Sequence, residues 1–103
     1  MKSNFMKHGE EAFAISSKVD RILKENGFWR SGDSSVFIHK SPEVRIVKRP
    51  GTRQGSVVDF GYVERQLRNG DGWMTKNVMR SEDFANADNP MKALEEADET
   101  IPK

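Results

Sequence analysis

Hydrophobic positions recur along the chain with two different periods, and each period predicts a different kind of element. From about residue 10 to residue 26 the apolar side chains fall on one face of a helix, at Ala12, Ile15, Val19, Ile22 and Leu23. Asn26-Gly27 follows, and glycine adopts the left-handed backbone conformation common at helix ends without a Cβ clash. We therefore expect the first helix to end at this pair.

Two short runs typical of strands come next. Val36–His39 and residues 44–48 are separated by Lys40-Ser41-Pro42-Glu43, a turn with proline in its second position. The pattern predicts a β-hairpin. The side chains expected to pack on the first helix are Val36, Ile38, Val44 and Ile46.

A second helical period is predicted from Ser56 to about residue 68. Ser56 and Asp59 have the spacing of a capping box, in which each side chain reaches the other's free backbone N–H. Phe60, Val63 and Leu67 then form an apolar stripe, and Asn69-Gly70 supplies a stop.

The last third of the chain is less regular. Residues 73–79 fit either a third strand or the start of a helix that runs to Phe84, and the spacing of Met74 and Val78, about one turn, favours the helix. A short helix is expected over residues 90–98. The predicted fold is a small single α+β domain: helix, β-hairpin, helix, a further short element and a mobile acidic tail.

Charge divides the chain at about residue 80. Residues 81–103 hold seven acidic residues against Lys92 and Lys103, which leaves −5, whereas the first 80 residues hold 15 basic and 9 acidic residues, or +6. We therefore expect a compact basic domain over 1–80 and a flexible acidic tail over 81–103. A purely solubilising, disordered end is the alternative interpretation of the tail.

Composition excludes several classes of chemistry. The chain has no cysteine, so it has no disulfide, thiolate metal site or cysteine nucleophile. Its histidines, His8 and His39, lack the spacing of metal ligands, and no metal or cofactor is expected. No apolar run has the length of a membrane span or of a secretory signal. We expect a soluble, cytoplasmic protein.

One hairpin resembles a known family. Gly32-Asp33-Ser34-Ser35-Val36-Phe37, followed by a turn and Val44-Arg45-Ile46-Val47-Lys48, is similar to the first hairpin of the N-terminal lobe of protein kinases. The resemblance covers residues 32–48. It implies a phosphate-pairing role for Lys48 and an ion-pair role for Glu64 on the next helix. Asp59-Phe60-Gly61 repeats the letters of the kinase magnesium motif, but it follows Lys48 by only eleven residues, and no catalytic loop lies between them.

A basic cluster is the first candidate binding surface. It is formed by Lys40, Arg45, Lys48, Arg49 and Arg53. Arginine and lysine in a loop with glycines are typical of phosphate or nucleic-acid binding, and either Trp29 or Phe37 could stack on a base. A solvated strand edge protected by charge is the alternative interpretation.

Docking on a larger protein is the function that the sequence favours. Aromatic residues in loops are common anchors of protein contacts, and an acidic tail with apolar positions is a typical docking segment. The expected partner-binding residues are Trp29, Trp73, Met91 and Leu94. Non-catalytic adaptors and inhibitors of this size are common among phages and mobile elements. Nucleic-acid binding by residues 40–53 is the alternative, and a phosphate- or nucleotide-handling enzyme is less favoured because no catalytic motif is present.

Overall fold

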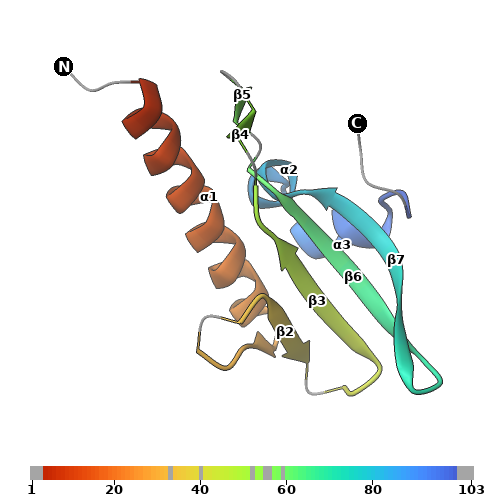
Figure 1. Cartoon of the computed structure of the whole chain (residues 1–103). Helices are drawn as coiled ribbons and strands as arrows, with labels where there is room; N and C mark the ends of the chain where they lie inside the picture. Colours follow the sequence, from red (N-terminus) through yellow and green to blue (C-terminus); the bar gives the residue numbers. More distant parts are fainter. Residues whose placement is uncertain are drawn as a thin grey trace.

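A curved antiparallel sheet with helices on one side is the central feature of the structure (Figure 1). The structure is a computed structural model that describes residues 4–32, 34–39, 41–51, 53–54, 57–58 and 60–99. Its helices are α1 (Asn4–Glu25), α2 (Ser81–Asn86) and α3 (Pro90–Glu95). Its strands are β1 (Phe28–Trp29), β2 (Val36–His39), β3 (Val44–Arg49), β4 (Arg53–Gln54), β5 (Val57–Val58), β6 (Tyr62–Asn69) and β7 (Gly72–Arg80). The predicted α+β class is confirmed.

The main sheet has the strand order β1-β2-β3-β6-β7, and every neighbouring pair is antiparallel. The short β4–β5 hairpin is inserted between β3 and β6 and forms a separate two-stranded sheet. Strands of the main sheet that follow one another in sequence are therefore also neighbours in space, with β4 and β5 left out of the order. Because side chains alternate between the two faces of a strand, this register decides which residues meet the helices.

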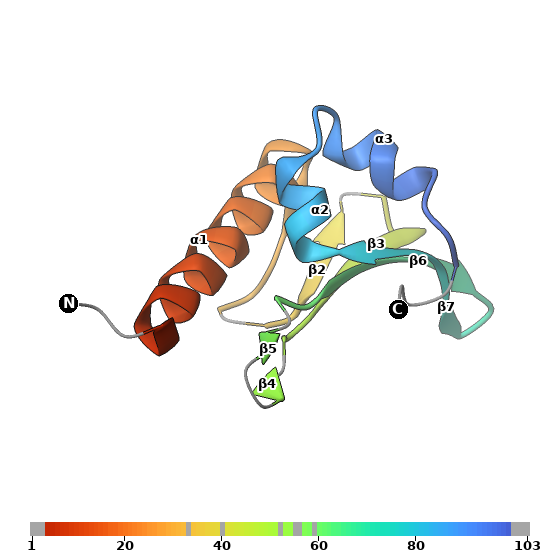
Figure 2. The ribbon, with the colours of Figure 1, turned by 90° about the horizontal axis from the view of Figure 1, so that it is seen from above.

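The hydrophobic core lies between the helices and one face of the sheet (Figure 2). It joins side chains from α1, β1, β2, β3, β6, α2 and α3, which are Val19, Leu23, Phe28, Phe37, Ile46, Val63, Phe84, Ala85 and Leu94. All three helices in the described part of the chain lie on this side. The other face carries no helix there.

The first helix follows the predicted pattern and begins earlier than expected, at Asn4. Val19 and Leu23 are fully buried, and Ile15 and Ile22 pack at the margin of the core. The helix ends where predicted, because Gly27 takes a φ of 87°.

The predicted hairpin is confirmed, but half of its predicted inner face is wrong. Val36 lies opposite Val47 and Phe37 lies opposite Ile46, so even positions of β2 share a face with odd positions of β3. Phe37 and Ile46 are therefore the buried pair, whereas Ile38 points to the face without helices. The turn sets this register, and the hydrophobicity pattern alone does not reveal it.

The predicted second helix is wrong, because residues 57–58 and 62–69 are strands. Gly61 separates them with a φ of 90°, and a Cβ there would lie 2.2 Å from the Arg49 carbonyl oxygen. A helix cannot contain this conformation. Asn69-Gly70 is the turn of a β6–β7 hairpin, with Gly70 at a φ of 61°, and Asn-Gly is a strong hairpin signal as well as a helix stop. The predicted capping residues Ser56 and Asp59 lie outside the described residues.

The helix favoured for residues 73–79 is also wrong, and the strand alternative is correct, since β7 covers the segment. The helix α2 starts only at Ser81, immediately after this strand. The spacing of Met74 and Val78 fits a strand as well as a helix turn. The pairing of β6 with β7 shifts its register once: Arg65 lies opposite Asn77, whereas the next residue, Gln66, lies opposite Thr75.

The C-terminal segment packs on the sheet. The predicted short helix is present as α3, where the Asn89 side chain accepts a hydrogen bond from the Lys92 backbone N–H. Leu94 of this helix is fully buried in the core. Beyond the helix, the Asp98 carbonyl accepts a hydrogen bond from Val78 N–H, so the chain runs beside β7. Residues 100–103 of the predicted tail lie outside the described residues.

Replacement of Leu94 by alanine tests whether α3 belongs to the domain. We expect Leu94→Ala to lower the free energy of unfolding by about 2–5 kcal/mol, because it leaves a cavity in the shared core. Urea denaturation measures the change. Lys92→Ala on the same helix is the control and should change stability by less than about 0.5 kcal/mol, since Lys92 is exposed. An unchanged midpoint for Leu94→Ala would show that α3 is detached in solution.

Candidate binding site on the open face of the sheet

The face of the main sheet that carries no helix in the described chain is called the open face here (Figure 2). Strand pairing places one continuous row of side chains across it, from β1 to β7. Each residue of this row lies opposite the next, in the order Trp29, Ile38, Arg45, Gln66 and Thr75. Five segments that are separate in sequence therefore contribute to one surface.

The β1 end of the open face is apolar and exposed. Trp29 is 54% exposed and Ile38 is 44% exposed, and the two residues are direct cross-strand partners. Their neighbours in sequence, Phe28 and Phe37, point to the core and are buried. Alternation along two short strands thus brings two large apolar side chains together in water, at the edge of the sheet.

The β7 end of the open face combines one tryptophan with two arginines. The guanidinium carbon of Arg45 lies 4.5 Å from the centre of the Trp73 ring, and that of Arg68 lies 5.1 Å from it. Both distances are within the range of cation–π attraction. Arg45 is also held by Gln66, because its Nε donates a hydrogen bond of 2.8 Å to Gln66 Oε1.

A buried carboxylate occupies the middle of the open face. Glu64 accepts hydrogen bonds from Arg49 Nε at 2.7 Å, from Gln66 Nε2 at 3.2 Å and from Thr75 Oγ1 at 3.3 Å. Val47 and Val78 lie opposite Glu64 on the two neighbouring strands, and both are buried. The neighbouring side chains therefore shield Glu64 from water although no helix of the described residues covers it.

The pKa of Glu64 reflects opposing effects. Burial of the carboxyl raises its pKa, but the hydrogen bond and the positive charge of Arg49, together with the hydrogen bonds from Gln66 and Thr75, lower the pKa below its usual value. The carboxylate form is therefore the one that the folded protein stabilises. Its partners are already in place, which gives Glu64 a structural role in the centre of the face.

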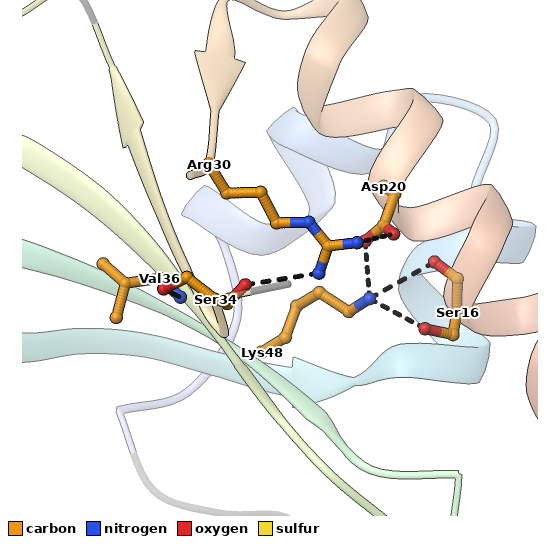
Figure 3. A network of polar contacts seen from close by, with 6 residues as sticks. All are labelled: Ser16, Asp20, Arg30, Ser34, Val36 and Lys48. Carbon is orange, nitrogen blue, oxygen red and sulfur yellow. Dashed lines mark hydrogen bonds and ion pairs between the residues drawn. The ribbon is translucent and has the colours of Figure 1, made fainter. Parts of the chain in front are cut away.

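Lys48 lies on the opposite face and joins the sheet to α1 (Figure 3). Its ammonium donates to Asp20 Oδ1 at 2.5 Å and to Ser16 Oγ at 2.8 Å. Asp20 Oδ2 in turn accepts a hydrogen bond of 2.9 Å from Arg30. One aspartate therefore fixes two cations between the helix and the strands, where the Lys48 side chain is only 15% exposed.

The structure separates the residues of the predicted basic cluster. Arg45 and Arg49 lie on the open face, whereas Lys48 faces α1. Lys40 and the side chain of Arg53 lie outside the described residues. A continuous basic loop surface is thus not formed by the described members of the cluster, because adjacent strand positions point to opposite faces.

The predicted partner-binding residues divide in the same way. Trp29 and Trp73 lie on the open face, at its two ends. Leu94 is buried in the core and Met91 packs against it, so these two side chains serve the fold rather than an exposed docking segment.

Sequence reasoning missed several residues of the open face. They are Ile38, Glu64, Gln66, Arg68 and Thr75. The alternation of Val63, Arg65 and Leu67 with Glu64, Gln66 and Arg68 is a strand pattern and could have identified three of them. The helical spacing of Phe60, Val63 and Leu67 concealed it.

The ion pair that the kinase resemblance implies is not formed. Glu64 lies on a strand rather than a helix, and its carboxylate binds Arg49. Lys48 binds Asp20 on the other side of the sheet. The hairpin therefore has the predicted strands but not the predicted pairing of these two residues.

Comparisons with protein-family models, with curated proteins and with solved structures find no match for this chain. The kinase resemblance stays a prediction from residues 32–48. Among the helices of the described residues, none has the length and apolar character needed to cross a membrane. Over the same residues, no three His, Asp or Glu side chains gather where they could hold a metal ion.

The pH dependence of stability tests the role of Glu64. A carboxylate with a lowered pKa in the folded state adds stability above its unfolded pKa of about 4.3, and this stability is lost as the pH falls through the folded pKa. We expect Glu64→Gln to cost about 1.5–3 kcal/mol at pH 7, because a hydrogen-bonded charge is lost. The difference from the native protein should shrink as the pH falls below about 4.3.

Urea denaturation between pH 7 and acidic pH measures this difference. Glu99→Gln is the matched control, since Glu99 pairs with Lys76 in an exposed position and should contribute little. A gap between the native protein and Glu64→Gln that stays constant with pH would contradict the assigned role.

Proposed function

We propose that this chain is a non-catalytic binding protein, an adaptor or inhibitor that docks on a larger protein through the open face of its sheet. The observation that carries the proposal is the exposed pair Trp29 and Ile38. Two large apolar side chains in direct contact with water lose that exposure when a partner covers them, and each Å² of apolar surface buried contributes roughly 25 cal/mol. An apolar pair of this kind is a typical interaction site.

The local structure holds Trp29 in place before any partner binds. Phe28, on one side of it, is buried in the core, and Arg30, on the other side, pairs with Asp20 and lies over the Phe37 ring at 5.1 Å. The backbone of β1 is thus fixed at both of its flanks. A preorganised anchor loses less conformational entropy on binding than a mobile one.

The composition of the open face also fits a protein partner. Tryptophan is among the residue types that contribute most often to binding free energy in protein interfaces, and Trp29 is the exposed tryptophan at the proposed docking site. Two charged groups that could serve catalysis, Glu64 and Lys48, already have partners within the fold, and this supports a non-catalytic role. Glu64 is bound to Arg49 and Lys48 to Asp20, so both are engaged in structural ion pairs.

A pull-down from source-cell lysate with the tagged full chain tests the proposal. We expect the native chain to retain a defined set of proteins that persists after nuclease treatment. The double variant Trp29→Ala, Ile38→Ser should lose that set, because the apolar anchor is removed. Circular dichroism establishes that the variant is folded.

Phe13→Ala is the matched control. Phe13 is 75% exposed on α1, outside the open face, so its removal takes away an exposed apolar side chain without touching the proposed site. Retention of the same proteins by the double variant, or loss of all of them after nuclease treatment, would contradict docking through Trp29 and Ile38.

A further inference from the structure

Two positive charges are held close together at the β7 end of the open face. The guanidinium groups of Arg45 and Arg68 both lie over the Trp73 ring, at 4.5 and 5.1 Å from its centre. Their central carbons are therefore at most about 10 Å apart, a separation at which like charges repel each other. We call Arg45, Arg68 and Trp73 the arginine–tryptophan site.

No carboxylate of the described residues forms an ion pair with either arginine of this site. The contrast with other arginines of the sheet is clear, since Arg30 pairs with Asp20 and Arg49 pairs with Glu64. Glu43 lies at the same end of the sheet, where its carbonyl accepts a hydrogen bond from Arg68 N–H, yet its carboxylate does not bind Arg68. The charge of the site is left uncompensated within the described part of the chain.

The site is nevertheless ordered. Gln66 fixes Arg45 through a hydrogen bond of 2.8 Å to its Nε, and the Trp73 ring supports both guanidinium groups. Arginine held in this way keeps the donors on its terminal nitrogens for a ligand, and its planar shape suits bidentate binding of phosphate oxygens. Arg80 of β7 lies opposite Tyr62, and Tyr62 lies opposite Arg49 of β3. Arg80 is therefore on the open face and adds a positive charge to it.

We propose that the arginine–tryptophan site binds the phosphate backbone of single-stranded nucleic acid. Consecutive phosphates of one strand provide repeated negative charges for the two arginines, and a guanidinium plane offers a surface on which an unpaired base can stack. Unpaired bases of a single strand can reach the site directly, whereas the bases of a duplex are stacked and paired inside the helix. This site goes beyond the proposed protein docking and uses β3, β6 and β7 instead of the Trp29–Ile38 pair.

Fluorescence anisotropy with a labelled oligo(dT) of about 20 nucleotides tests the site. The full chain should bind this probe, and its affinity should fall as the salt concentration rises from about 50 to 200 mM. The double variant Arg45→Gln, Arg68→Gln should bind more weakly. Its slope of log affinity against log salt should be smaller by roughly 1.4, since each phosphate contact of a single strand contributes about 0.7.

The double variant Lys18→Gln, Arg21→Gln is the matched control, because it removes the same charge from exposed positions on α1. It should keep the native slope. Three results would overturn the proposal: no binding of oligo(dT) by the native chain at low salt, an unchanged slope in the arginine variant, or equally tight binding of poly-glutamate. Equal affinity for a duplex of the same length would overturn the assignment to single strands.

Discussion

The one-sided packing of the sheet is the constraint on which the rest of the structure depends. All three helices in the described chain lie against the face that carries Phe37, Ile46 and Val63, and their apolar side chains join these in a single core. The ion pairs of Asp20 with Lys48 and Arg30 add a polar connection between α1 and the sheet at the margin of this core. No described helix covers the opposite face, so its side chains must stabilise one another or remain available to a partner.

The open face does both. Its centre is closed by Glu64 and the groups that bind it, so that a buried carboxylate is stabilised without a helix above it. Its two ends differ from the centre, because Trp29 and Ile38 are exposed at one end and two arginines lack carboxylate partners among the described residues at the other. The contrast between a satisfied centre and unsatisfied ends is the physical basis for the proposal that this face binds a partner.

The pattern of apolar and polar residues was sufficient to predict an element wherever it fits only a helix or only a strand. The apolar face of α1 and the Asn26-Gly27 stop predicted the first helix, and the two β-type runs around Pro42 predicted the β2–β3 hairpin. The pattern failed where two periods coincide. Val63 and Leu67 satisfy helical spacing and strand alternation equally, and the positive φ of Gly61 with its close approach to Arg49 excludes a helix through residue 61. That contact is between residues distant in sequence, so local reasoning could not reveal it.

The sequence predicted several residues of the candidate site, but it did not predict on which face of the sheet each of them lies. The sequence predicts protein binding by Trp29 and Trp73 and phosphate or nucleic-acid binding by Arg45 and Arg49, and the structure places all four on one face. Lys48 was expected beside them, but alternation turns it toward α1, where Asp20 binds it. Leu94 appeared available because its segment is short and acidic, yet tertiary packing buries it. Arg68 and Ile38 join the face through strand register, which depends on turns and not on composition.

Hydroxyl-radical footprinting of the isolated chain tests the one-sided packing most directly, because Ile38 and Ile46 are the same residue type on opposite faces. Ile38 is 44% exposed and Ile46 is fully buried. We expect rapid oxidation of Ile38 and of Trp29, with Ile46 protected until the protein unfolds. Protection of Ile38 equal to that of Ile46 in the isolated chain would show that the open face is already covered, and it would contradict one-sided packing of the sheet.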